Sequence, residues 1–196
     1  MSTSLLLAYI GVVLMVGVSG LASAVATARC GMAAVGALKK NSGAFGSYMI
    51  LSALPGSQGL YGFVGYFMVS GYICEGMPMI TSVGIFGAGL LMAIVCLSSA
   101  LFQAKVCANG IAAIGNGNDV MGKTLILAAF PELYAILGVA ATFLISSAIS
   151  TQGLTDQKDL NKEYVKAELT TEQAQAEGVI EFNEELEKQQ AQNPAK

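Results

Sequence analysis

The chain has 196 residues, of which 54% are hydrophobic and 12% charged, and it contains no histidine and no tryptophan. Its net charge of −3 comes from the C-terminal part, because residues 152–196 carry ten acids and five bases, whereas residues 1–151 carry three acids and five bases. This charge gives no support to a nucleic-acid partner. The hydrophobic composition and the uneven distribution of charge together predict a membrane domain over positions 1–150, followed by an acidic, water-soluble tail.

Four long hydrophobic segments, each of bilayer length or more, are separated by short polar turns. The segments cover residues 5–37, 46–72, 79–114 and 121–150, and the turns are Lys39–Gly43, Cys74–Pro78 and Gly115–Asp119. No basic residue precedes Arg29, so the N-terminus lacks the charged region of a secretory signal, and we expect the first segment to be retained. The pattern predicts an all-α membrane protein with four transmembrane helices.

The basic residues of the membrane domain all lie near the first and third turns. They are Arg29, Lys39, Lys40, Lys105 and Lys123. The positive-inside rule therefore places these two turns in the cytoplasm and both termini outside. With four helices, the acidic tail is predicted to be extracytoplasmic.

The two halves of the membrane domain repeat each other. Residues 31–36 read GMAAVG and residues 110–115 read GIAAIG, an offset of 79, whereas Pro55 and Gly62 match Pro131 and Gly138 at an offset of 76. We therefore predict two tandem helical hairpins, over residues 1–75 and 76–150, and a tail over residues 151–196.

One acidic residue lies deep inside a hydrophobic segment. Glu132 is in the fourth segment, where a carboxylate costs a few kcal/mol or more, and such residues usually mark a proton or ion path. The structural alternative is a glutamate that faces a polar neighbour and only orients the helices. The repeat has Gly56 at the equivalent position, so one membrane acid serves two hairpins.

Two glutamines lie at a depth similar to that of Glu132. Counted from the cytoplasmic turns at 1.5 Å per residue, Gln58, Gln103 and Glu132 are all roughly 20–24 Å into the membrane domain. Leu54, Ser57, Gln58 and Tyr61 also share helical i, i+3, i+4, i+7 spacing. Converging oxygen atoms suit a desolvated hard cation. Equally, membrane glutamines often hydrogen-bond between helices with no ion involved.

Other kinds of site find little support in the sequence. The four cysteines form no CxxC pair, and we expect Cys30, Cys96 and Cys107 to be small buried side chains in apolar helices. No phosphate-binding loop or nucleophile constellation is present, so the chain is not expected to be an enzyme.

Three stretches resemble the duplicated proteolipid, the K or c subunit, of bacterial V/A-type rotary ATPases. They are LPGSQGLYGFV (54–64), FQAKV (102–106) and PELYAILG (131–138), within a resemblance that covers about residues 8–150. The resemblance implies a homo-oligomeric rotor ring in the bacterial inner membrane. A membrane stator subunit and a central-stalk subunit on the cytoplasmic turns would be its partners, and ATP chemistry would belong to other chains.

The resemblance also implies an ion-binding site. Glu132 matches the carboxylate, Gln58 and Gln103 match its two amide ligands, and Leu54 matches a main-chain carbonyl ligand. Ser57 stands where a hydroxyl-bearing Thr is typical, and Tyr61 matches a tyrosine that hydrogen-bonds the carboxylate. Retention of both glutamines favours Na⁺ over H⁺, with no organic cofactor.

The sequence departs from the family pattern in two places. Leu133 replaces a common Thr, and Pro131 precedes the glutamate. The tail is absent from the pattern, and it is predicted either to be a solvated extension or to form helices that pack between copies. The competing interpretations of the whole chain are a stand-alone four-helix carrier that uses Glu132 for proton or cation coupling, and a purely structural membrane scaffold.

Overall fold

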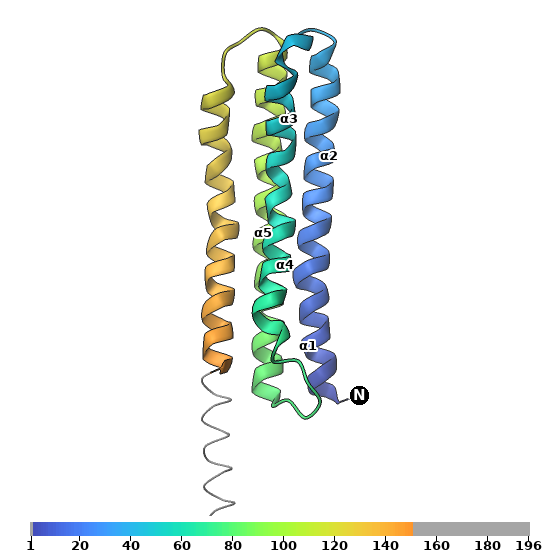
Figure 1. The fold of residues 1–196 in the computed structure, drawn as a ribbon, viewed down its shortest axis with the longest axis vertical. Coiled ribbons are helices and arrows are strands. Elements are labelled where there is room, and N and C mark those ends of the chain that lie inside the picture. Colours follow the sequence, from blue (N-terminus) through green and yellow to red (C-terminus); the bar gives the residue numbers. More distant parts are fainter. Residues whose placement is uncertain (1, 151–196) are drawn as a thin grey trace, which may run out of the picture. The chain divides into compact units, whose positions relative to one another are not determined.

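The computed structural model describes residues 2–150. Residue 1 and the predicted acidic tail, residues 151–196, lie outside the described residues. The described part runs up and down as four long helical rods, joined by turns that alternate between the two ends (Figure 1). This arrangement confirms the predicted all-α fold of two tandem hairpins.

The first two rods are built from several helical pieces. Their elements are α1 (Thr3–Val13), the π-helical segment η1 (Leu14–Val18) and α2 (Ser19–Leu38), then a 3₁₀ turn η2 (Ser42–Ala44), α3 (Phe45–Ala53), a second 3₁₀ turn η3 (Leu54–Gly56) and α4 (Ser57–Ser70). The third rod is α5 (Met79–Gly115), and the fourth is the helix Met121–Ser150.

Three helices in the described part have the length and apolar composition needed to cross a bilayer: Thr3–Leu38, Met79–Gly115 and Met121–Ser150. The second predicted span, residues 46–72, is helical over residues 45–70, but the 3₁₀ turn divides it into two shorter α-helices. Proline at position 55 explains the division, because its ring removes a main-chain donor and disfavours continuous α-helix.

Hydrogen bonds link the two turns that lie next to the basic residues, Lys39–Gly43 and Gly115–Asp119. The Lys40 Nζ donates to Asn116 Oδ1 at 2.8 Å, and the Asn41 side-chain amide donates to the Ile114 carbonyl at 3.3 Å. The Tyr48 hydroxyl donates to the Asn41 carbonyl at 3.0 Å. The two hairpins therefore end in one shared, hydrogen-bonded surface.

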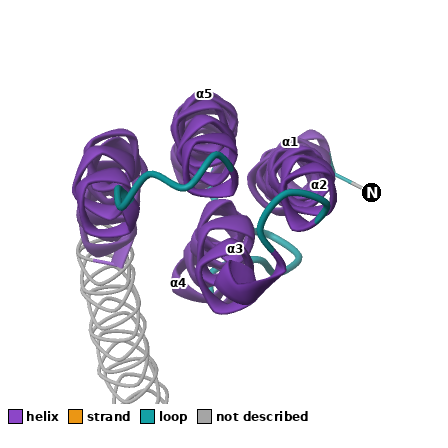
Figure 2. Cartoon of the chain, turned by 90° about the horizontal axis from the view of Figure 1, so that it is seen from above, coloured by secondary structure: helices purple, strands orange, loops and turns teal. Residues whose placement is uncertain are grey.

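The hairpins pack through small residues, which allow close helix contact. α2 packs against α5, and α3 and α4 lie against both of them, while the helix Met121–Ser150 lies beside α5 (Figure 2). Cys30, Cys96 and Cys107 are all buried in this packing, as predicted. Among the glycines of the described part, the closest approach is between Gly11 and Gly89, where a side chain on Gly89 would overlap the Gly11 carbonyl.

Equivalent positions of the two hairpins are related by an offset of 76 in the numbering. Gly56 faces Thr27 in the first hairpin, and Glu132 contacts Gln103 in the second. The offset of 79 predicted for the first and third helices from GMAAVG and GIAAIG is therefore wrong. Those motifs carry glycine and alanine at packing positions, and such residues recur along any tightly packed membrane helix.

Candidate ion-binding site

Glu132 lies on the helix Met121–Ser150, which continues without a break through Pro131. Its half-buried carboxylate accepts two hydrogen bonds from other helices. The Tyr61 hydroxyl donates to Oε1 at 2.8 Å, and the Gln103 side-chain amide donates to Oε2 at 3.1 Å. Each carboxylate oxygen is thus held by a donor, which fixes the side chain and lowers the cost of a negative charge in an apolar region.

Behind the carboxylate, two fully buried glutamines are linked by hydrogen bonds. Gln103 Nε2 donates to the Ala128 carbonyl at 3.0 Å as well as to Glu132. Gln58 Nε2 donates to Gln103 Oε1 at 2.8 Å and to Ser99 Oγ at 3.0 Å. We call this series, from the Ala128 carbonyl through Gln103 and Gln58 to Ser99, the amide chain.

One oxygen atom of the amide chain takes no part in these hydrogen bonds. Gln58 Oε1 is buried and accepts no hydrogen bond from any of the residues that the structure describes. An unpaired buried polar atom costs about 1–3 kcal/mol, so such an atom in a native protein calls for an explanation. A carbonyl-type oxygen that points at no donor is suited to coordinate a cation.

The remaining predicted site residues, Leu54 and Ser57, lie at the 3₁₀ turn of the second rod. The Leu54 carbonyl accepts the Ser57 main-chain N–H, as the tight turn requires, and it also accepts the Ser57 hydroxyl at 3.3 Å. The two residues therefore bond to each other. The hydrogen bonds described above join four of the six predicted residues into one network, namely Glu132, Gln103, Gln58 and Tyr61, and the Ser57 side chain also interacts with Tyr61.

The site is made mainly of oxygen atoms, which hard cations prefer. Within the described part of the chain, no three residues among His, Cys, Asp and Glu gather to hold a metal ion. The two residues that sequence reasoning missed are Ser99 and Ala128. Each lies four positions before a recognised site residue on the same helix, so helical spacing could have identified both.

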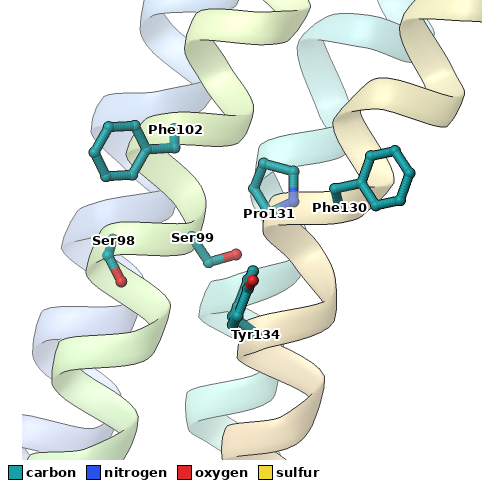
Figure 3. Close-up of a pocket in the computed structure, with 6 residues that line it drawn as sticks. All are labelled: Ser98, Ser99, Phe102, Phe130, Pro131 and Tyr134. Carbon is teal, nitrogen blue, oxygen red and sulfur yellow. The ribbon is translucent and has the colours of Figure 1, made fainter.

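An apolar groove of about 300 Å³ lies beside the site, between α5 and the helix Met121–Ser150 (Figure 3). It is lined by Ser98, Ser99, Phe102, Phe130, Pro131 and Tyr134. At the offset of 76, Tyr134 occupies the position that Gln58 has in the first hairpin. The groove therefore carries apolar and aromatic groups where the first hairpin supplies an amide.

Comparison with known proteins agrees with the internal repeat. The family of ATP synthase C subunits matches twice, at residues 10–69 and 86–145, and both the starts and the ends of the two matches differ by the same offset of 76. The V-type sodium ATPase subunit K of Enterococcus hirae is 37% identical over 127 residues, which cover 65% of this chain and 81% of that protein. The A-type ATP synthase subunit K of Methanocaldococcus jannaschii is 30% identical over 141 residues, covering 72% of this chain and 62% of that protein.

Proposed function

The chain belongs to the family of ATP synthase C subunits, as a duplicated proteolipid of V/A-type rotary ATPases, and we propose that it carries one Na⁺ per chain on Glu132 as a rotor ring turns. It is a non-catalytic, multi-pass membrane subunit, and ATP hydrolysis or synthesis belongs to other subunits. The similarity to a subunit of a sodium ATPase supports Na⁺ as the ion.

The observation that carries this proposal is the site geometry. A carboxylate with two donors lies in one network with a buried amide oxygen, Gln58 Oε1, that accepts no hydrogen bond from the described residues. A cation between these groups would neutralise the carboxylate and satisfy the amide oxygen at once. A proton on Glu132 would neutralise the charge but leave Gln58 Oε1 unpaired, so the arrangement favours Na⁺ over H⁺.

The ligands would come from two hairpins. Glu132 and Gln103 of the second hairpin and Gln58 of the first would bind the ion through side-chain oxygens. The Leu54 carbonyl would complete the shell, and the Ser57 hydroxyl, which donates to that carbonyl at 3.3 Å, would contribute hydrogen bonding at the site. Tyr61 would hold the carboxylate in the binding position.

Transport follows from neutralisation. With Na⁺ bound, the site has no net charge and can pass through lipid without the cost of a bare carboxylate. A cationic group on the stator, such as an arginine, would compete for Glu132 and release the ion into an aqueous half-channel. The turns Lys39–Gly43 and Gly115–Asp119 would face the cytoplasm of a bacterial cell and seat a central-stalk subunit, with both termini on the other side of the inner membrane.

Carbodiimide labelling of the purified ring, mapped by mass spectrometry, tests the proposal. The reagent attacks a protonated carboxyl group in an apolar site, so we expect it to modify Glu132, and we expect Na⁺ but not K⁺ to suppress the reaction. Glu75, which is exposed in the turn between the hairpins, is the internal control and should be insensitive to Na⁺.

The other outcomes are equally informative. Labelling of Glu132 that Na⁺ leaves unchanged would assign the rotor to H⁺. A ring in which Glu132 is not labelled at all would contradict the proposed role of Glu132 as the ion-binding carboxylate.

A further inference from the structure

Within the described part of the chain, Ser99 is the one side chain outside the predicted set that hydrogen-bonds a candidate ligand. It is almost fully buried on α5, and its Oγ accepts the Gln58 amide at 3.0 Å. We propose that Ser99 is a positioning residue for the ion site. By holding the amide nitrogen of Gln58, it presents the amide oxygen to the ion. This inference rests on the proposed Na⁺ function.

The contacts of Gln103 fix which groups of the amide chain donate hydrogen bonds and which accept them. Gln103 lies against two groups that only accept hydrogen bonds, the Ala128 carbonyl and the Glu132 carboxylate. It must therefore turn its nitrogen toward them. Its oxygen then faces Gln58, which must in turn present a nitrogen, because two amide oxygens at 2.8 Å would repel each other.

Ser99 completes this order. The Gln58 nitrogen carries two hydrogens, of which one goes to Gln103 and the other to Ser99. With both hydrogens bonded, the amide cannot rotate without losing two buried hydrogen bonds, so Oε1 stays where no described residue donates to it. Without the hydroxyl, only one bond would hold the amide, and a buried N–H would lack an acceptor.

The serine next to Ser99 and the serine at the equivalent position of the first hairpin make different hydrogen bonds from Ser99. Ser98 donates its hydroxyl to the Ile94 and Val95 carbonyls of its own helix. Ser23, the equivalent of Ser99 in the first hairpin, accepts the main-chain N–H of Gly59 at 2.8 Å and thereby ties two helices together. Figure 3 shows Ser99 pointing from α5 toward the helix Met121–Ser150, whereas Ser98 points away from that helix.

The test compares Ser99→Ala with Ser98→Ala in intact rings. The measured quantity is the Na⁺ concentration that half-protects Glu132 from carbodiimide. We expect Ser99→Ala to raise it about five- to tenfold, the effect of one buried hydrogen bond, and Ser98→Ala to leave it unchanged. Labelling in the absence of Na⁺ should persist in both variants, since Tyr61 and Gln103 still hold the carboxylate.

A double-mutant cycle separates positioning from general packing. If Ser99 acts through Gln58, then Ser99→Ala should have no further effect in a Gln58→Ala background. An equal loss in both backgrounds would overturn the inference, as would identical protection curves for Ser99→Ala and the wild type. Wild-type labelling that does not respond to Na⁺ would instead overturn the Na⁺ assignment, and this inference with it.

Discussion

The two hairpins share a framework but differ at the level of the site. Pro55 and Pro131 occupy equivalent positions, as do Gly62 and Gly138, and both glycines lie where two helices of one hairpin come close together. At the site level, however, Gly56 stands where the second hairpin has Glu132. The shared proline and glycine positions serve helix packing, which both hairpins need. The position of Glu132 serves the candidate site, which forms at one interface only.

The difference extends to the residues around the carboxylate. Thr27 stands in place of Gln103, and its hydroxyl donates to the Ser23 carbonyl of its own helix at 2.8 Å. Tyr134 stands in place of Gln58 and lines an apolar groove. The first hairpin supplies Gln58 and the second supplies Glu132, so neither hairpin holds the candidate site alone. Of the two similar interfaces, only the one in the second hairpin thus carries the carboxylate and its amide partner in the part of the chain that the structure describes.

The largest effect is expected at the acid that the first hairpin lacks. Glu132→Gln keeps the size and shape of the side chain but removes its negative charge and replaces one of its two acceptor oxygens with an NH₂ donor, so we expect ion-coupled transport to fall to background. ATP hydrolysis by the detached soluble sector should continue. Transport in reconstituted vesicles is the measurement, and Glu75→Gln, in the exposed turn, is the matched control. Coupled transport that survives Glu132→Gln would contradict the role of the carboxylate.

The paired glycines should differ in their tolerance of a methyl group. A Cβ at Gly62 would overlap the Met15 carbonyl and Ser19, and the main chain cannot move aside easily. A Cβ at Gly138 would overlap the Val95 side chain and lie close to the Met92 sulfur, but these are side chains, which can shift more easily than the main chain at Met15. We expect Gly62→Ala to cost about 1–3 kcal/mol of stability and Gly138→Ala less.

Thermal unfolding of the two variants in the same detergent measures this difference. The reverse order of melting temperatures, or equal values, would show that the first hairpin is not the more tightly packed of the two at this level.

A smaller effect is expected at the hydroxyl that the first hairpin contributes to the carboxylate. Tyr61→Phe removes the donor to Glu132 Oε1, 2.8 Å away, so one oxygen of the carboxylate would lose the bond that holds it in position for the proposed Na⁺. The Na⁺ concentration that half-protects Glu132 from carbodiimide should rise about three- to tenfold. Tyr66→Phe, whose ring lies against Phe63 and Phe67, should have no effect. Equal protection in Tyr61→Phe and the wild type would remove Tyr61 from the site.

The smallest effect is expected at the first hairpin's equivalent of Glu132. A Cβ at Gly56 would lie 3.6 Å from Thr27 Cγ2, an ordinary van der Waals contact. Gly56→Ala should therefore assemble and transport like the wild type, as measured by ring yield and ion transport. A strong transport defect in Gly56→Ala would contradict the expectation that the contact between Gly56 and Thr27 tolerates a methyl group.

The fold was largely predictable because its signals are strong and local. Apolar segments of bilayer length alternate with turns such as Lys39–Gly43, and polar turns between such segments mark helix ends reliably. The grouping of Gln58, Gln103 and Glu132 was also predictable, since counting along the helices places them at one depth and the structure bonds them in series.

Other features depend on contacts that a sequence does not reveal. The hydrogen bond between the Ser57 hydroxyl and the Leu54 carbonyl depends on a 3₁₀ turn. The sequence did not predict this turn, although Pro55 indicated that the helix is distorted there. No pattern in the sequence predicted the π-helical segment Leu14–Val18. Ser99 has helical spacing from Gln103, but it was missed because a serine in a membrane helix usually bonds its own main chain, as Ser98 does.

The 3₁₀ turn Leu54–Gly56 also sets the rotational phase of the second rod. Three residues advance about 360° around the axis of a 3₁₀-helix, compared with about 300° in an α-helix, so the residues after the turn are rotated by about 60° relative to an uninterrupted helix. Gln58 and Tyr61 both follow the turn. The azimuth from which they reach Gln103 and Glu132 is therefore set by a local change of helical pitch. The fourth rod, which keeps its α-helical pitch through Pro131, has no such phase step.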